Sequence, residues 1–328
     1  MTQLKRRTFL GAALCAAALP LSAMGASSYP GNRPIRLIVP YTPGGGTDSV
    51  ARAIAAKITQ QVGWTVIVEN RPGAGGNIGM GVVASAAPDG YTLALGQTSN
   101  LAINPAMLDN MPFDASKDFE AVAVLASVPV VLVVKENARW KTLADLIKEA
   151  REKPGAIKQA LAGSGTVGHV AGELLANQGK FEVLNVPYRG AAPALNDLLG
   201  ESTDYMFATP QATQAMLKGN VLRPLAVSSR ERLEILPDVP TVAESGYEGF
   251  EAVDWKALVA PKGTPSEIVL AINRVIQDVL TDPATIAMFT AEGSIALRGS
   301  PQEATQYIGE EQKKWAALIE KAGIKAAQ

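Results

Sequence analysis

The chain has very little of the chemistry that metal sites and disulfide frameworks require. Its 328 residues include one cysteine and one histidine. A single cysteine excludes a disulfide within the chain, and the two residues together are too few for a Cys/His zinc cluster. One imidazole allows at most one catalytic dyad that uses histidine. Aromatic residues make up only 5%, and the four tryptophans, at positions 64, 140, 255 and 315, are too dispersed to form a stacking platform for bases or sugars.

An excess of charge of either sign is also absent. The chain has 30 Lys and Arg against 31 Asp and Glu. Its overall charge therefore attracts neither nucleic acid nor an anionic membrane, and we expect no nucleic-acid partner. Hydrophobic residues account for 47% of the chain, which excludes a disordered protein. At this length we expect about two domains with buried cores.

The first 26 residues are predicted to be an export signal rather than part of the fold. Lys5, Arg6 and Arg7 precede an apolar stretch at 11–21, and small residues at 23–26 offer a cleavage site. The paired arginines resemble a twin-arginine signal, with general secretion as the alternative. The apolar stretch is shorter than the about 20 residues that a bilayer-spanning helix needs. We therefore expect a periplasmic protein that loses Cys15 with its signal, a location that disfavours a nucleotide cofactor.

After the signal, short apolar runs alternate with helical patterns. The run at 35–39 is rich in β-branched residues and ends at a glycine cluster. A helix follows, capped by Thr47 and Asp48, with apolar positions that recur every four residues. The strands expected in this first unit are residues 35–39, 65–68 and 91–95. A βαβαβ order of this kind predicts a parallel sheet.

The middle of the chain predicts a crossing between two domains. Residues 119–134 are too long and too apolar for one ordinary strand, and Pro129 indicates two strands in series. A second unit of the same kind follows. Its expected strands are 159–162, 183–186, 204–207 and 222–227, and its expected helices are 143–151, 169–178 and 191–199. The rest of the chain contributes a strand at 257–259 and helices at 265–280, 283–290 and 301–322.

These patterns predict an α/β protein with two lobes, each a mostly parallel sheet flanked by helices. We expect the last segment to return to the first domain, because the crossing segments lie in mid-chain. The predicted boundaries are 27–126 plus 229–328 for the first lobe and 127–228 for the second.

Three loops have the chemistry of a ligand site, because ligands of open α/β sheets bind beyond the carboxyl ends of the strands. The loop 41–48 leaves backbone N–H groups open at a helix N-terminus, which suits an anion such as a carboxylate. The loop 163–168 has the same property in the second half and adds two hydroxyls. In the third, 188–193, Arg189 is able to form a two-point contact with a carboxylate. The alternatives are tight turns and a solvated arginine.

Two enzyme hypotheses use the same residues. Residues 163–168 fit G-x-G-x-x-G, and Arg189 would hold the 2′-phosphate in an NADP-dependent oxidoreductase. Against this, the motif lies in mid-chain and no acidic residue ends the next strand. Ser164 with His169 would suit acyl transfer, but Ser164 lacks the glycines of a nucleophile elbow. We expect His169 near the start of a helix as a neutral imidazole that packs or forms hydrogen bonds. Asp254 is one of several carboxylates at separate strand ends.

The order of several motifs gives a specific resemblance. It rests on IVPYTPGGGTD at 38–48 and ENRPGAGG at 69–76, and it continues at 88–93, 163–174, 186–190, 223–227 and 236–246. These motifs resemble those of the Bug family, the TctC-like substrate-binding receptors of tripartite tricarboxylate transporters. The resemblance covers essentially the whole chain after the signal.

The resemblance implies a two-lobed periplasmic binding protein with a type II-like fold and a deep cleft. Such a protein closes on a small carboxylate and delivers it to a membrane permease. It implies a monomer without catalytic activity, cofactor or metal. A receptor that senses its ligand without transport is the alternative.

The resemblance implies that the ligand is held by backbone amides, hydroxyls and ordered waters. The matching positions in this sequence lie in four segments. The predicted ligand-binding residues are Tyr41, Thr42, Pro43, Gly44, Gly45, Gly46, Thr47, Gln97, Thr98, Ser99, Ser164, Gly165, Thr166 and Thr209, together with Tyr188 and Arg189 from the third loop and His169 from the helix that follows the second loop. Family members differ between Pro40 and Gly44, so the resemblance does not specify which carboxylate is bound.

Overall fold

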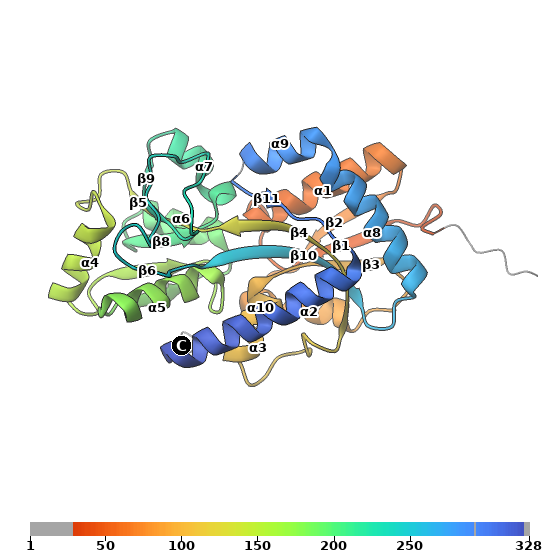
Figure 1. Cartoon of the computed structure of the whole chain (residues 1–328), viewed down its shortest axis with the longest axis horizontal. Helices are drawn as coiled ribbons and strands as arrows, with labels where there is room; N and C mark the ends of the chain where they lie inside the picture. Colours follow the sequence, from red (N-terminus) through yellow and green to blue (C-terminus); the bar gives the residue numbers. More distant parts are fainter. Residues whose placement is uncertain (1–28, 292, 325–328) are drawn as a thin grey trace, which may run out of the picture.

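The computed structural model describes residues 29–291 and 293–324 and shows two β-sheets side by side, each flanked by helices (Figure 1). The predicted signal at 1–26, with Cys15, lies outside these residues. One sheet has six strands in the order β11-β4-β10-β3-β1-β2, and the other has five in the order β7-β6-β8-β5-β9. The first lobe is named here for the six-stranded sheet and the second lobe for the five-stranded sheet. Both ends of the described chain belong to the first lobe.

The six-stranded sheet is mixed rather than mostly parallel. Strands β1, β2 and β3 are parallel to one another, as the βαβαβ pattern predicts. Strand β10 returns from the second lobe and inserts between β3 and β4 in the opposite direction, so its pairings are antiparallel. The strands are β1 (Ile35–Val39), β2 (Val66–Asn70), β3 (Thr92–Gln97), β4 (Phe119–Pro129), β10 (Val253–Pro261) and β11 (Ile295–Ala296).

The five-stranded sheet is mixed for a similar reason. Strands β6, β7 and β8 are parallel, and β5, which enters from the first lobe, is antiparallel to both β8 and β9. The predicted strands and helices of this unit are confirmed. They are β5 (Val131–Lys135), β6 (Lys158–Leu161), β7 (Leu184–Pro187), β8 (Tyr205–Ala208) and β9 (Leu222–Val227), with α4 (Leu143–Glu152), α5 (Val167–Gly179) and α6 (Ala191–Leu199). The structure adds α7 (Pro210–Lys218), which the sequence did not predict.

Helices cover both faces of the six-stranded sheet. The early ones are α1 (Gly46–Val62), η1 (Ala74–Gly76), α2 (Asn77–Ala84), η2 (Ser99–Ile103) and α3 (Asn104–Met107), and the late ones are α8 (Ser266–Thr281), α9 (Pro283–Ala291) and α10 (Pro301–Ala322). The apolar sides of α1 and α8 pack together on one face, through residues such as Ile54 and Ile276. Helix α10 packs on the other face through Ile308 and Trp315, as the predicted return of the C-terminal segment requires.

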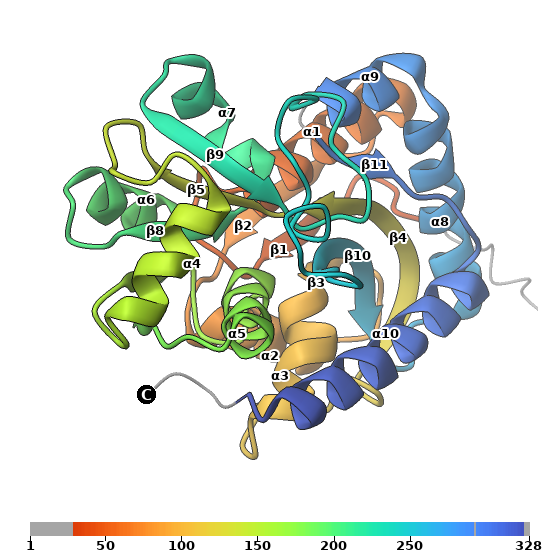
Figure 2. The ribbon, with the colours of Figure 1, turned by 60° about the vertical axis from the view of Figure 1, so that its left-hand side comes forward.

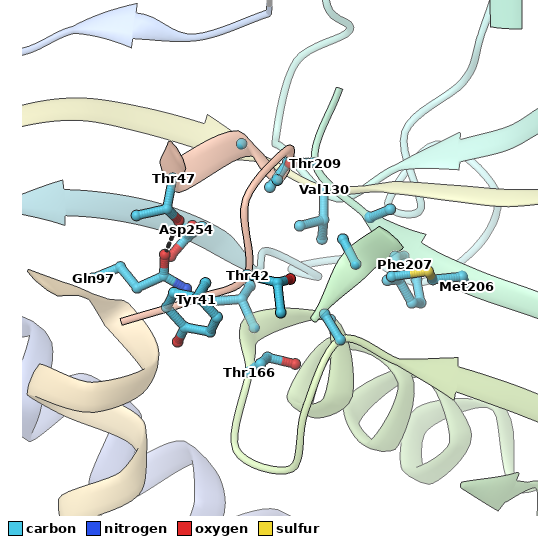
Figure 3. Close-up of a pocket in the computed structure, with 17 residues that line it drawn as sticks. Tyr41, Thr42, Thr47, Gln97, Val130, Thr166, Met206, Phe207, Thr209 and Asp254 are labelled. Carbon is cyan, nitrogen blue, oxygen red and sulfur yellow. Dashed lines mark hydrogen bonds between the residues drawn. The ribbon is translucent and has the colours of Figure 1, made fainter. Parts of the chain in front are cut away.

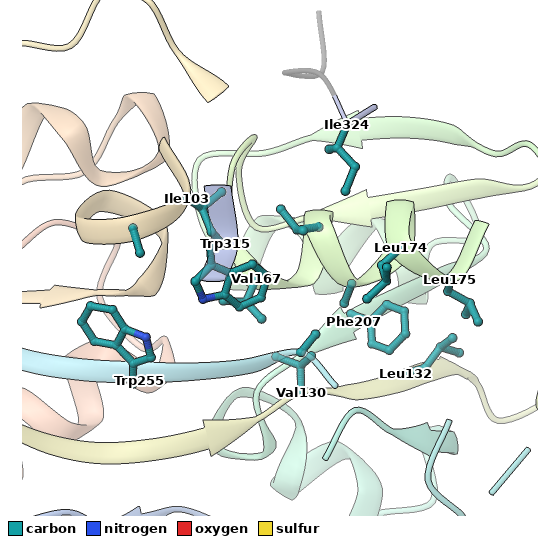
Figure 4. Packing of buried hydrophobic residues seen from close by; sticks show 14 of the residues in the cluster. Ile103, Val130, Leu132, Val167, Leu174, Leu175, Phe207, Trp255, Trp315 and Ile324 are labelled. Atoms are coloured by element: carbon teal, nitrogen blue, oxygen red, sulfur yellow. The ribbon is translucent and has the colours of Figure 1, made fainter. Parts of the chain in front are cut away.

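Helix α10 also contacts the second lobe. Its C-terminal end reaches α5, where the Asn177 amide donates to the Ala322 carbonyl at 3.3 Å (Figure 2). One buried apolar cluster runs from Trp255 and Trp315 in the first lobe to Val167 and Phe207 in the second (Figure 4). The lobes are therefore joined by side-chain packing as well as by the segments that cross between them.

The two crossings between the lobes meet at the side chain of Ser228, which is fully buried. Strand β4 ends at Pro129 and β5 begins at Val131, so a single extended segment passes from one sheet to the other, as Pro129 predicts. The Ser228 hydroxyl accepts a hydrogen bond from the Val130 N–H at 2.9 Å and donates one to the Ala252 carbonyl at 2.5 Å. One hydroxyl thus fixes the ends of β4, β9 and the segment that leads into β10.

We expect Ser228→Ala to lower the free energy of unfolding by about 1–3 kcal/mol, because it leaves a buried N–H and a buried carbonyl without this partner. Urea denaturation monitored by circular dichroism measures the change. Ser229→Ala is the matched control, since the Ser229 hydroxyl makes one local hydrogen bond, to the Glu231 carbonyl. Equal losses in the two variants would contradict the proposed role of Ser228.

Candidate functional site

A pocket with a cavity volume of about 70 Å³ lies between the lobes, at the carboxyl ends of β1, β3 and β8 (Figure 3). The structure brings together there eight of the predicted ligand-binding residues, which are Tyr41, Thr42, Gly45, Gly46, Thr47, Gln97, Thr166 and Thr209. They come from loops of both lobes, as expected for ligands of open α/β sheets.

Four helices begin at this pocket, α1 from the first lobe and α5, α6 and α7 from the second. Helices α1, α6 and α7 have no side-chain cap, because Gly45 and Gly190 lack a side chain and the Thr209 hydroxyl does not accept from the first turn. First-turn N–H groups have no partner within the helix, and they carry the positive end of the helix dipole. The pocket is therefore suited to an anion that accepts hydrogen bonds from both lobes.

The predicted cap of α1 is wrong in one detail. Thr47 and Asp48 lie inside the first turn, and the residue at the cap position is Gly45. Asp48 still satisfies a nearby amide, since its Oδ2 accepts from the Gly44 N–H at 3.0 Å and from Arg52 Nε at 2.9 Å. These hydrogen bonds from Arg52 and Gly44 hold the pKa of Asp48 below its usual value, although burial opposes them.

A chain of hydrogen bonds fixes the polar side chains of the first lobe. Thr47 Oγ1 donates to Gln97 Oε1, and Gln97 Nε2 donates to Ser99 Oγ at 3.2 Å. The Ser99 and Tyr41 hydroxyls share a further hydrogen bond, and Tyr41 donates to the Gly75 carbonyl at 2.9 Å. Burial raises the pKa of Tyr41 far above its usual value, so the phenol remains neutral. Ser99 thus positions Gln97 and Tyr41 from behind the pocket wall.

The other predicted residues lie around the pocket rather than on its wall. Pro43 and Gly44 are exposed in the loop before α1, and Thr98 Oγ1 accepts from the Trp255 backbone N–H at 2.8 Å. Ser164, Tyr188 and Arg189 line an adjoining hollow that shares Tyr41 and Ala162 with the pocket. Gly165 and His169 are described below.

His169 is buried inside α5, where its Nδ1 accepts a hydrogen bond from the Gly165 N–H at 3.2 Å. Burial lowers the pKa of its imidazole to about 4. The ring is therefore neutral at physiological pH, and it stabilises the turn that leads into α5.

Sequence reasoning missed several residues of the wall. Five are apolar or small residues of the second lobe and of the crossing segment, namely Val130, Ala162, Met206, Phe207 and Ala208. Three more, Val167, Gly168 and Ala191, lie in the predicted ligand loops but were not named as ligand residues. Asp254 also lines the pocket. The sequence placed a strand only at 257–259, whereas β10 begins at Val253, because two charged residues interrupt its apolar pattern. Their spacing of two, which puts both on one face of a strand, was the available signal.

Loops of the two lobes approach each other closely at glycines. A Cβ atom on Gly190 would lie 2.1 Å from Thr42 Oγ1, and one on Gly46 would lie 2.7 Å from Thr209 Oγ1. Each pair joins one lobe to the other. The structure therefore represents a closed arrangement of the lobes, and these positions leave no room for a side chain.

Within residues 29–291 and 293–324, no three His, Cys, Asp or Glu side chains lie together in a way that would hold a metal ion. No helix in the same part of the chain is both long enough and apolar enough to cross a bilayer.

The fold is that of a two-lobed periplasmic binding protein. The chain belongs to the TctC family, described as the tripartite tricarboxylate transporter family receptor, whose model matches residues 50–324. It is 36% identical over 309 residues to protein BugT of Bordetella pertussis, and the matched residues cover 94% of each chain. It is 35% identical to a UPF0065 protein from Pseudomonas sp. strain P51, covering 99% of this chain and 96% of that protein. The predicted Bug resemblance is thus confirmed.

The fold of this chain matches solved structures of relatives over nearly their full length. Rpa4515 of R. palustris, solved with adipate, has a TM-score of 0.88 and 34% identity and covers 90% of this chain and 99% of its own. MatC of Rhodopseudomonas palustris, solved with bound malate, has a TM-score of 0.83 and 31% identity over 88% of this chain and 99% of its own. The periplasmic binding protein BugD has a TM-score of 0.85 and 34% identity over 89% and 98% of the two chains. This chain is accordingly a solute-binding receptor.

We expect burial of His169 to make the stability depend on pH. Between the unfolded pKa of about 6.5 and the folded pKa of about 4, the unfolded chain binds a proton that the folded chain does not. The free energy of unfolding therefore falls as the pH falls, by about 2 kcal/mol between pH 7 and pH 5 from this group alone. Denaturation of the protein and of His169→Gln across this range measures the difference. Equal pH slopes in the two proteins would contradict the assignment.

Proposed function

We propose that this protein captures a small carboxylate between its lobes outside the cytoplasm and delivers it to a permease of the tripartite tricarboxylate type. The observation that carries the proposal is the convergence of uncapped helix N-termini from both lobes on one pocket. Each such contact with an anion contributes about 0.3–1 kcal/mol when exposed and up to about 2 kcal/mol when partly buried. Closure removes water from the pocket and strengthens these contacts.

Other features support parts of the proposal. Adipate and malate, named with two solved relatives, are both small dicarboxylates. The family description supports delivery to a permease, and the predicted signal at 1–26 supports export. We propose lobes of 27–126 plus 229–328 and of 127–228, acting as a monomer. The change of sheet between Pro129 and Val131, three residues after the 126/127 boundary, and the end of β9 at Val227 support a division near these positions.

Thermal-shift and calorimetric screening tests the binding step. We expect adipate, malate and related dicarboxylates to raise the melting temperature, whereas uncharged diamides of the same length do not. A ligand at 100 times its Kd stabilises the folded state by about 2.7 kcal/mol. Stabilisation by NADPH but by none of the acids would overturn the carboxylate assignment and favour the oxidoreductase hypothesis. Equal stabilisation by acids and diamides would contradict the proposed role of the helix N-termini, because that role depends on the negative charge of the ligand.

Uptake of the radiolabelled acid by vesicles that contain the permease tests the delivery step. We expect uptake to require the receptor and to saturate with it. Ligand binding without any receptor-dependent uptake would contradict delivery and identify a sensor.

Gly46→Ala is expected to weaken binding of the acid selected by the screen at least tenfold. The new Cβ would lie 2.7 Å from Thr209 Oγ1 across the pocket, so it opposes closure of the lobes. Gly46 starts α1, where alanine does not disfavour the helix, so the variant should remain folded. Calorimetry measures Kd, and Gly309→Ala, at a helical position with no neighbouring atom within 4 Å, is the matched control. Wild-type affinity in Gly46→Ala would show that closure does not need this contact.

A further inference from the structure

A buried carboxylate lies on the wall of the proposed carboxylate site. Asp254, on β10, is 3% exposed and lines the pocket beside Thr47 and Gln97 (Figure 3). Its Oδ2 accepts a hydrogen bond from Lys256 Nζ at 2.7 Å, and Lys256 is fully buried. The second carboxylate oxygen, Oδ1, is buried and has no hydrogen-bond partner among the described residues. A buried acceptor of this kind is rare in proteins, since each one costs stability.

The neighbouring donor on α1 is already engaged. Thr47 donates its hydroxyl proton to Gln97 Oε1 rather than to Asp254. Lys256, two residues along β10 and on the same face of the strand, bonds to the other carboxylate oxygen. The Asp254–Lys256 pair is electrically neutral and leaves one acceptor position open. That position is suited to a donor supplied from the pocket.

The charges around the pocket strengthen this argument. Among the residues that the structure describes, Asp254 is the only charged one that lines the pocket. A ligand carboxylate placed against Oδ1 would put two anionic oxygens together, which is unfavourable at low dielectric. The uncapped N-termini of α1, α6 and α7 offer better positions for ligand carboxylates. These positions would orient a ligand with its carboxylates on the helix ends and another group on Asp254.

We propose that Asp254 is a specificity-determining residue whose Oδ1 accepts a hydrogen bond from a hydroxyl or ammonium group on the ligand. The receptor then selects carboxylates that bear such a substituent over unsubstituted ones of the same length. This inference rests on the proposed function, because it concerns the same pocket. It adds the chemical class of the ligand and the residue that recognises it.

Matched ligand series test the proposal by calorimetry. Succinate, malate and aspartate share one carbon skeleton and differ only in a hydrogen, a hydroxyl or an ammonium group. Adipate, 2-hydroxyadipate and 2-aminoadipate form the same series at greater length. We expect a substituted acid to bind at least tenfold more tightly than its unsubstituted partner. Equal affinities within both series would mean that water alone satisfies Oδ1 and would overturn the inference, while the proposed function would stand. If none of the six acids bound, the proposed function itself would be contradicted.

Variants connect the preference to Asp254. The double variant Asp254→Val with Lys256→Met removes the acceptor and its cation together, which avoids leaving an unpaired buried charge. We expect it to bind the substituted and unsubstituted acids of a series with the same affinity, and circular dichroism checks its fold. Asp254→Asn keeps an acceptor oxygen but removes the charge, so it should weaken an ammonium ligand more than a hydroxyl ligand. The matched control, Lys57→Met with Asp282→Asn, removes an ion pair of 3.1 Å outside the pocket. A preference that persists in the Asp254/Lys256 double variant would overturn the assignment.

Discussion

The closed contact between the two lobes is the constraint on which the site depends. The backbone amides at any helix N-terminus attract anions. Here the N-termini of α1 and of the second-lobe helices face one small pocket only because the loops of the two lobes approach within contact distance. Glycines at 46 and 190 permit that approach. A ligand held from both sides stabilises the closed state by its differential affinity for that state, so binding and closure are one equilibrium.

The strand that returns from the second lobe has two roles. Strand β10 inserts between β3 and β4, which makes the first sheet mixed and carries the chain back to its core. Its first residues also bring the Asp254–Lys256 pair to the edge of the pocket. Ser228 fixes the crossing segment nearby, and α10 holds both lobes from the outside. The architecture therefore connects the stability of the crossings with the position of the site.

The wall of the pocket combines neutral donors with one carboxylate. Amides at helix ends attract anions of many kinds, so they provide affinity with little selectivity. Thr47, Gln97, Ser99 and Tyr41 are fixed by hydrogen bonds to one another, which reduces the freedom they lose on binding. An acceptor that lacks a partner in a closed pocket discriminates strongly, because only a ligand with a donor satisfies it.

The amino-acid sequence by itself determined most of the order of strands and helices, the crossing at Pro129 and the glycine-rich loops at strand ends, because these follow from local periodicity and backbone preference. It did not predict α3, α7 or β11. It was wrong about the cap of α1 and the mostly parallel sheets, and it missed Asp254 as a wall residue. Only the tertiary structure decided which face of β10 is buried and which apolar residues of the second lobe complete the pocket. Those features depend on contacts between segments far apart in the chain, and the spacing of residues within one segment does not record them.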